Sequence, residues 1–124
     1  MSHTNEMKHV RWSDLEPESV TPLFDRQYVV GDQIMIARIL MKRGCVVPEH
    51  SHRHEQISHI LSGTLEFKVA GKEVLVGAGE LLCIPPQVPH SARALEDTIA
   101  IDTFTPPRED WINKTDAYLR TSSS

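Results

Sequence analysis

Three histidines stand close together near the middle of the sequence, in the segment 50–56 (HSHRHEQ). The whole chain of 124 residues has seven histidines, so three within five positions form a much denser group than random scatter would give. Side chains alternate between the two faces of a strand, so His50 and His52 would share one face of an extended segment. Two imidazoles on one face are half of a transition-metal site. The pattern therefore predicts metal binding if the chain supplies further ligands.

Polar residues that could work beside a metal ion follow later in the chain. The segment PPQVPH, which ends in His90, must be an irregular loop, because three prolines cannot sit in a central strand. Asp102 and Phe104 share one face of a predicted strand. If that face is the inner one, Asp102 is a carboxylate beside the metal and a candidate general base. Arg108 follows, and its guanidinium can bind a carboxylate through two parallel hydrogen bonds.

The elements that must position these residues are predicted to be short β-strands. Runs of β-branched and aliphatic residues are separated by turns, and in 64–69 (TLEFKV) apolar and polar residues alternate strictly. Seven or eight strands at a spacing of roughly ten residues are typical of a β-sandwich or small barrel rather than a parallel sheet. The strands are expected at 27–30, 33–43, 57–61, 64–69, 73–76, 81–84, 91–95 and 98–104.

The two ends of the chain depart from this pattern. The first residues are polar and contain two prolines, which predicts an extended arm. Trp111 and Tyr118 fall at helical spacing and predict a short helix over 108–119 that packs back onto the barrel, followed by a disordered tail at 121–124. The prediction is a single domain with an N-terminal arm (1–25), a β-barrel (26–105) and a C-terminal helix with the tail (106–124).

Composition argues against two classes of partner. The chain has a net charge of −4, a pI near 5.9 and no basic run, which argues against nucleic-acid binding. Its apolar runs are only a few residues long, so no membrane span is expected, and the first residues lack the apolar core of a signal peptide. Cys45 and Cys83 could pair, but two cysteines in a chain of this class are more often reduced. These features predict a cytoplasmic protein.

The histidine segment resembles the first of the two motifs of the cupin family. That motif runs Gly, five residues, His-x-His, three or four residues, Glu, six residues, Gly. Here Gly44 is followed at these spacings by His50 and His52, then by Gln56, and then by Gly63. The glutamine stands where the family commonly has a glutamate.

A second block resembles the other cupin motif, which runs Gly, five residues, Pro-x-Gly, two residues, His, three residues, Asn. Gly79, Pro85 and His90 fit this spacing, whereas Gln87 and Ala94 stand in the places of the glycine and the asparagine. The resemblance implies an all-β fold, the cupin jelly-roll β-barrel (a double-stranded β-helix), with a metal inside, an N-terminal arm and a short C-terminal helix.

The resemblance also implies that His50, His52, Gln56 and His90 hold one divalent transition metal ion, which could be Zn, Ni, Mn, Fe or Co. Three neutral imidazoles and a neutral carboxamide leave the ion its full charge. This favours Lewis-acid work on an anionic substrate over the charge-neutralised iron centre typical of oxygen activation. Glu55 is adjacent, but a shift of one residue turns a side chain to the opposite face, so Gln56 is the predicted ligand.

The segment 101–111 (IDTFTPPREDW) is similar to the terminal signature of small pectin-degradation cupins of the KdgF type, whose metal set also matches. Those enzymes convert 4,5-unsaturated uronate monosaccharides, released by pectate and alginate lyases, to linear 4-deoxy-5-keto uronates. The resemblance implies a metal-dependent isomerase in which Asp102, Phe104 and Arg108 handle a small anionic sugar. Homodimers are common among cupins, so a homodimer is expected.

Two other functions fit the same residues. One is a cupin dioxygenase acting on a small carboxylate, against which Gln56 counts. The other is a metal-containing sugar or carboxylate sensor without turnover. The dioxygenase would depend on iron and consume oxygen. The sensor would bind its ligand without turnover.

Several residues also have plainer structural interpretations. Asp102 could be a satisfied buried acid, Phe104 could belong to the core, and Arg108 could pair with Glu109 or Asp110. Two further residues are given roles by their position alone. His54 is predicted to lie at the rim or in the layer of residues that supports the metal ligands, or else to be merely exposed. Arg38 is predicted to be an additional anion contact on a strand that lines the barrel.

Overall fold

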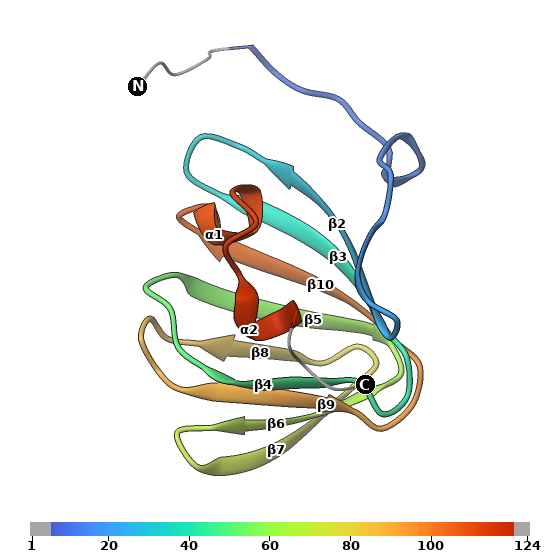
Figure 1. The fold of residues 1–124 in the computed structure, drawn as a ribbon, viewed down its shortest axis with the longest axis vertical. Helices are drawn as coiled ribbons and strands as arrows, with labels where there is room; N and C mark the ends of the chain where they lie inside the picture. Colours follow the sequence, from blue (N-terminus) through green and yellow to red (C-terminus); the bar gives the residue numbers. More distant parts are fainter. Residues whose placement is uncertain (1–5, 121–124) are drawn as a thin grey trace.

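The fold is a sandwich of two antiparallel β-sheets, as a computed structural model that describes residues 6–120 shows (Figure 1). The predicted tail at 121–124 lies outside the described residues. This architecture confirms the predicted jelly roll. The six-stranded sheet holds, in spatial order, β1 (Glu18–Thr21), β2 (Phe24–Val30), β3 (Met35–Met41), β10 (Thr98–Thr105), β5 (Glu55–Ser62) and β8 (Leu81–Ile84), and the four-stranded sheet holds β4 (Val46–His50), β9 (His90–Ala94), β6 (Thr64–Val69) and β7 (Lys72–Gly77).

The inward side chains follow the alternation that the sequence predicts. In β10, Ala100, Asp102 and Phe104 are buried while the residues between them are more exposed. In β6, Leu65 and Phe67 point into the same core. Burying side chains of this size contributes about 1.5–3 kcal/mol each, which makes register slips costly. The core packing therefore places Asp102 on the inner face of β10, which is otherwise apolar.

Two strands and a helical turn lie where the sequence predicted no regular element. β1 lies within the segment predicted to be an extended arm, and it pairs with β2. β4 lies in the approach to the histidine segment and pairs with β9. Before β1, a 3₁₀ turn η1 (Trp12–Asp14) is held by Gln27, whose carboxamide donates to the backbone carbonyls of Trp12 and Leu15 at 2.8 Å each.

The single helix predicted over 108–119 is wrong. Two helices of one turn each, α1 (Glu109–Ile112) and α2 (Ala117–Arg120), take its place. Lys114 has a φ of +59°, a left-handed backbone conformation that ends an α-helix. After this turn the chain carries α2 into contact with β1 and β4, which are edge strands of the two sheets. The C-terminal segment thus bridges the two layers (Figure 1).

Ion pairs hold this segment in place. Arg26 on β2 and Asp116 are fully buried and pair through Nη1 and Oδ2 at 2.6 Å. Glu18 on β1 accepts from Arg26 at 2.9 Å, from Lys114 at 2.9 Å and from Arg120 at 2.6 Å. Removing one partner of a buried ion pair leaves an uncompensated charge and costs roughly 3–5 kcal/mol. The network therefore gives α2 one defined position.

The two cysteines are free, Cys45 in the core and Cys83 on the surface. Burial raises the pKa of the Cys45 thiol to about 11, so its reactive thiolate form is disfavoured. Within residues 6–120, no helix has the length and apolar character needed to cross a lipid bilayer.

The Glu18 network should make stability depend on pH. Burial raises the pKa of Glu18, but hydrogen bonds from Arg120, Arg26 and Lys114 outweigh it and lower the pKa from 4.5 to about 2. Because the unfolded state takes up the proton first, this contribution is complete above pH 4.5 and is lost as the pH falls toward 2. Glu18→Gln should therefore lower the free energy of unfolding by about 1–2 kcal/mol at pH 7.

Urea denaturation from pH 7 to pH 2.5 measures this effect. The difference between the wild-type protein and Glu18→Gln should shrink as the pH falls. Glu73→Gln, at an exposed position on β7, is the matched control and should change little. Equal stabilities of wild type and Glu18→Gln at pH 7 would contradict the assigned role.

Candidate metal centre

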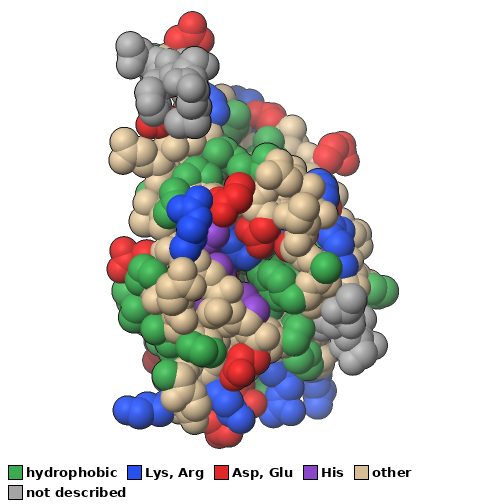
Figure 2. Space-filling model, turned by 60° about the vertical axis from the view of Figure 1, so that its left-hand side comes forward, with side chains coloured by type: hydrophobic (Ala, Val, Ile, Leu, Met, Phe, Trp, Pro, Cys, Tyr) green, Lys and Arg blue, Asp and Glu red, His purple; other side chains and the backbone are tan. Residues whose placement is uncertain are grey.

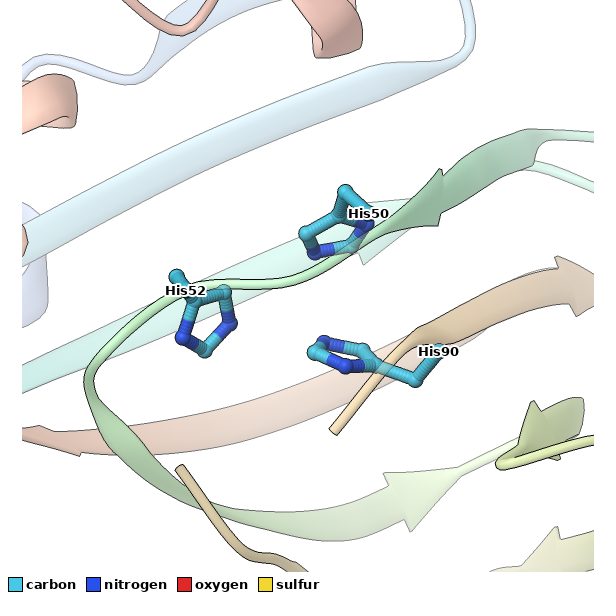
Figure 3. A group of neighbouring side chains, drawn as sticks. All are labelled: His50, His52 and His90. Atoms are coloured by element: carbon cyan, nitrogen blue, oxygen red, sulfur yellow. The ribbon is translucent and has the colours of Figure 1, made fainter. Parts of the chain in front are cut away.

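Three histidine side chains converge on one point between the sheets (Figure 3). His50 ends β4 and His90 begins β9, and the two residues are opposite each other in the antiparallel pair. His52 follows in the loop between β4 and β5. The potential ligand nitrogens of the three rings all lie within 4.8 Å of one another. β4 ends at His50, so His52 does not share a strand with it, but the loop returns the His52 side chain to the same point.

Each of these rings is oriented by its own backbone hydrogen bond. The Nδ1 atoms of His50, His52 and His90 lie 2.8, 3.1 and 2.8 Å from the carbonyl oxygens of Pro48, His54 and Val88. A carbonyl oxygen only accepts, so each Nδ1 carries the proton and each Nε2 keeps a lone pair. The Nε2 atoms of His52 and His90 are buried and have no hydrogen-bond partner among the described residues. Histidines that bind a metal ion have this arrangement: Nε2 faces the ion, and Nδ1 is held by a hydrogen bond to another group.

The three rings are kept neutral. Burial is the largest cause, and it lowers the pKa of His50 to about 4 and that of His52 to about 3. Burial also lowers the pKa of His90. Neutral imidazole is the form that binds metals. The centre is therefore ready for a cation near neutral pH without first losing protons.

Gln56 is buried on the inner face of β5, whereas Glu55 is exposed. The Gln56 Nε2 donates to Ser58 Oγ at 3.0 Å and lies 3.5 Å from Asp102 Oδ2. Because a carboxylate can only accept, the NH₂ group faces Asp102 and the carbonyl oxygen is available as a ligand. Gln56 lines the same cavity as His50 and His90. The donors present, imidazole nitrogens and an amide oxygen, fit a divalent transition metal ion.

The loop that carries His52 is tied to the loop before His90. The backbone N–H of Gln87 donates to the His52 carbonyl at 2.7 Å. Gln87 has a φ of +68°, in the left-handed region that favours glycine. This is the position where the second motif departs from its glycine, and the backbone keeps the conformation that glycine allows. The hydrogen bond to His52 helps to hold this strained residue in place.

Asp102 and Phe104 both line the cavity that His50 and His90 also line. Burial raises the pKa of Asp102 to about 6, although a hydrogen bond with Ser58 and the charge of Arg108 act in the opposite direction. A carboxyl group with such a pKa can accept a proton near neutral pH. Phe104 packs edge-on against Trp111 with ring centroids 5.2 Å apart.

Arg108 is also buried and lines this cavity. Its guanidinium lies 5.0 Å from the centres of the Phe104 and Trp111 rings. Its Nε and Nη2 donate to the two oxygens of Asp110 at 2.9 and 2.8 Å. One edge of the guanidinium fork is therefore occupied by Asp110, one of the two partners that the sequence suggested.

His54 and Arg38 differ from parts of their sequence predictions. His54 is buried, not exposed, and its Nε2 lies 3.1 Å from a carboxylate oxygen of Glu109 on α1. Arg38 does not line the barrel: it alternates with the buried residues of β3 and so lies on the outer face. Its Nη1 contacts Gln27 Oε1 at 3.4 Å. The two-residue period of the strand explains why Arg38 cannot reach the cavity.

Sequence reasoning missed one residue of the site. Tyr118 was predicted only to pack the C-terminal helix, but its ring stacks on His50 with centroids 4.3 Å apart and an interplanar angle of 23°. Its hydroxyl accepts from Arg108 Nη2 at 2.5 Å. Its helical spacing from Trp111 predicts only that it packs against the barrel. No local motif marks it as a site residue.

The surface around the centre is mixed in charge. Histidine side chains come to the surface in a recess, with acidic and basic side chains on one side and hydrophobic side chains on another (Figure 2). Arg53 and Glu109 form an ion pair at 3.0 Å between the histidine loop and α1. The recess therefore offers the metal centre a route to solvent.

Comparisons with known proteins agree with this architecture. The model of the Cupin domain family matches residues 37–103, more than half of the 124 residues. An RmlC-like cupin from Shewanella frigidimarina NCIMB 400 is 30% identical, with a TM-score of 0.80, over 86% of this chain and 96% of that chain. KdgF from Halomonas sp. is 27% identical, with a TM-score of 0.81, over 86% of this chain and 99% of that chain.

A more distant likeness concerns the fold alone. A predicted oxalate decarboxylase from Thermotoga maritima is 21% identical, with a TM-score of 0.71, over 81% of this chain and 100% of that chain. No curated protein sequence gives a significant match to the chain.

Removal of one converging histidine should abolish metal retention. His52→Ala should lower the affinity for a divalent ion by more than the roughly 10–100-fold that loss of an outer partner costs. Metal content after dialysis against a competing chelator measures the effect. His59→Ala, on the opposite face of β5 from Gln56, is the matched control and should retain the ion. Equal retention by the two variants would contradict the assignment.

Proposed function

The chain belongs to the cupin domain family, and from that premise we propose that it is a metal-dependent isomerase of 4,5-unsaturated uronate monosaccharides. The observation that carries the proposal is the buried carboxylate of Asp102, which shares one cavity with His50, His90 and the cationic Arg108. The likeness to KdgF over nearly the whole length of that protein supports it.

His50, His52, Gln56 and His90 would hold the divalent ion. When bound, the ion supplies a Lewis acid that stabilises negative charge developing on a substrate oxygen. All four side chains are uncharged, so the protein does not cancel the charge of the ion. Such a centre suits an anionic substrate, which a uronate is.

Asp102 is proposed as the base. Ring opening begins when its carboxylate takes the proton of the anomeric hydroxyl. As the carbonyl forms at that carbon, the bond to the ring oxygen breaks and its electron pair leaves with the oxygen as an enolate. A proton added at the neighbouring alkene carbon then gives the ketone. One proton leaves oxygen and one arrives at carbon, so the product is an isomer of the substrate.

Arg108 and Phe104 are proposed to bind the sugar. Arg108 lies in a buried site where attraction to a carboxylate is stronger than in water. Asp110 fixes the guanidinium and stacking on Phe104 and Trp111 supports its plane. Phe104 offers an apolar surface to a sugar ring. A uronate from pectin or alginate breakdown has the carboxylate that this arrangement would bind.

The homodimer and the cytoplasmic location stay predictions.

Asp102→Asn should separate catalysis from metal binding. The variant keeps the shape and the hydrogen-bonding contacts of the side chain but cannot act as a base. Turnover should fall on the order of 10²–10⁴-fold while metal content stays unchanged. The assay follows the ultraviolet absorbance of the conjugated double bond of lyase-generated unsaturated galacturonate.

Asp25→Asn, on β2 and outside the cavity, is the matched control and should retain full turnover. If Asp102→Asn turns over at nearly the wild-type rate, Asp102 is not the base. A variant that lost its metal would instead point to a structural role for Asp102 at the centre.

A further inference from the structure

Ser58 carries a buried hydroxyl on the inner face of β5 and is only 1% exposed. It follows Gln56 by two residues on the same face, and it stands directly opposite Asp102 in the pairing of β5 with β10. The next inward pair along these two strands, Ile60 and Ala100, is apolar. Burying a hydroxyl is costly unless it is hydrogen-bonded. The partners of Ser58 therefore indicate what this serine does.

The Ser58 hydroxyl is used both as an acceptor and as a donor. Its oxygen accepts from Gln56 Nε2 at 3.0 Å. It also forms a hydrogen bond with the carboxylate of Asp102. Because a carboxylate only accepts, the single proton of the hydroxyl points to Asp102. The hydroxyl thus joins a proposed metal ligand to the proposed base.

This single proton determines which way the Gln56 amide turns. Since the proton is engaged with Asp102, the hydroxyl can only accept from Gln56, and the amide must present its NH₂ group. Asp102 favours the same orientation, because its Oδ2 lies 3.5 Å from the Gln56 Nε2. The amide oxygen is then the atom left for the metal centre. The reverse orientation would turn the NH₂ group toward the ion, and an amide NH₂ group only donates.

Ser58 is placed to act through its two partners and not on a substrate. Among the described residues, Gln56 and Asp102 line the cavity and Ser58 does not. The three residues lie on two paired strands of one sheet, so the backbone that carries them is well ordered. Functional side chains keep their geometry when residues on rigid elements support them from behind.

We propose that Ser58 is a positioning residue that sets two groups of the site at once. It turns the oxygen of the Gln56 amide toward the metal ion, and it holds the Asp102 carboxylate in place to take a proton. The role toward Asp102 rests on the proposed function, whereas the role toward Gln56 requires only that the centre binds a metal.

Metal affinity of the full-length protein tests the role toward Gln56 without turnover. The protein is stripped with a chelator and titrated with Co²⁺ in competition with a chromophoric chelator. Ser58→Ala should weaken Co²⁺ binding about 10-fold, the low end of the cost of losing an outer partner of a ligand. Because Ser58 acts on the ion only through Gln56, the double variant Ser58→Ala/Gln56→Ala should bind Co²⁺ as Gln56→Ala alone does.

Turnover at saturating metal tests the role toward Asp102. Ser58→Ala should lower kcat about 10-fold, because the carboxylate loses the partner that holds it. KM should stay within about 2-fold of the wild-type value, since the serine does not touch the substrate. A purely structural role in the core would change the melting temperature without separating kcat from KM.

Two further variants serve as controls. Ser62→Ala makes the same substitution at an exposed position of β5 and should behave as the wild type. Ser58→Thr keeps the hydroxyl and should bind Co²⁺ as the wild type does. Wild-type Co²⁺ affinity in Ser58→Ala would overturn the inference, as would losses that add up in the double variant. If Ser58→Ala does not fold, Ser58→Thr decides, and binding as weak as that of Gln56→Ala would overturn the inference.

The two assays separate this inference from the proposed function. If the wild type converts unsaturated galacturonate and Ser58→Ala matches it in Co²⁺ affinity and kcat, the isomerase stands and the role of Ser58 is wrong. If the wild type shows no turnover but Ser58→Ala weakens Co²⁺ binding through Gln56, the role of Ser58 at the metal stands and the isomerase is wrong.

Discussion

The structure depends on the burial of three neutral imidazoles around one point. His90 is buried and His50 and His52 are half-buried. Each ring has its Nδ1 on a backbone carbonyl, so that lone pairs are left facing inward. This arrangement requires the pairing of β4 with β9, which sets His50 opposite His90. It also requires the loop between β4 and β5, which Gln87 ties back to the centre through the carbonyl of His52. Inward polar groups of this kind are costly unless a ligand or partner uses them.

The C-terminal segment completes the site that the barrel begins. The matched family region ends at residue 103, yet Arg108 and Tyr118 reach the cavity from beyond it. Buried charges hold this segment, with Asp116 on Arg26 and Asp110 on Arg108. Two guanidinium groups also stack on Trp111, that of Arg26 at 4.4 Å and that of Arg108 at 5.0 Å. The same residues therefore stabilise this edge of the sandwich and fix the geometry of the site.

Much of this could be predicted from the sequence because local patterns determine it. The spacing of histidines indicated the centre, and the two-residue period of β10 placed Asp102 inward. What could not be predicted arises from contacts distant in sequence. No local pattern shows that Tyr118 meets His50, 68 positions earlier, or that a turn at Lys114 divides the helix. Arg38 was misplaced because its long strand was assigned without knowing which face met the core.

We propose that the convergent histidines hold a metal ion and that this ion makes the cavity the active site of an isomerase of unsaturated uronates. The most direct measurement compares the wild-type protein, stripped by a chelator and then reloaded with a divalent ion, on lyase-generated unsaturated galacturonate. Ultraviolet absorbance of the conjugated double bond should fall faster than its spontaneous rate only with the reloaded protein. A reloaded protein with its metal bound that gives no acceleration over the spontaneous rate would contradict the account.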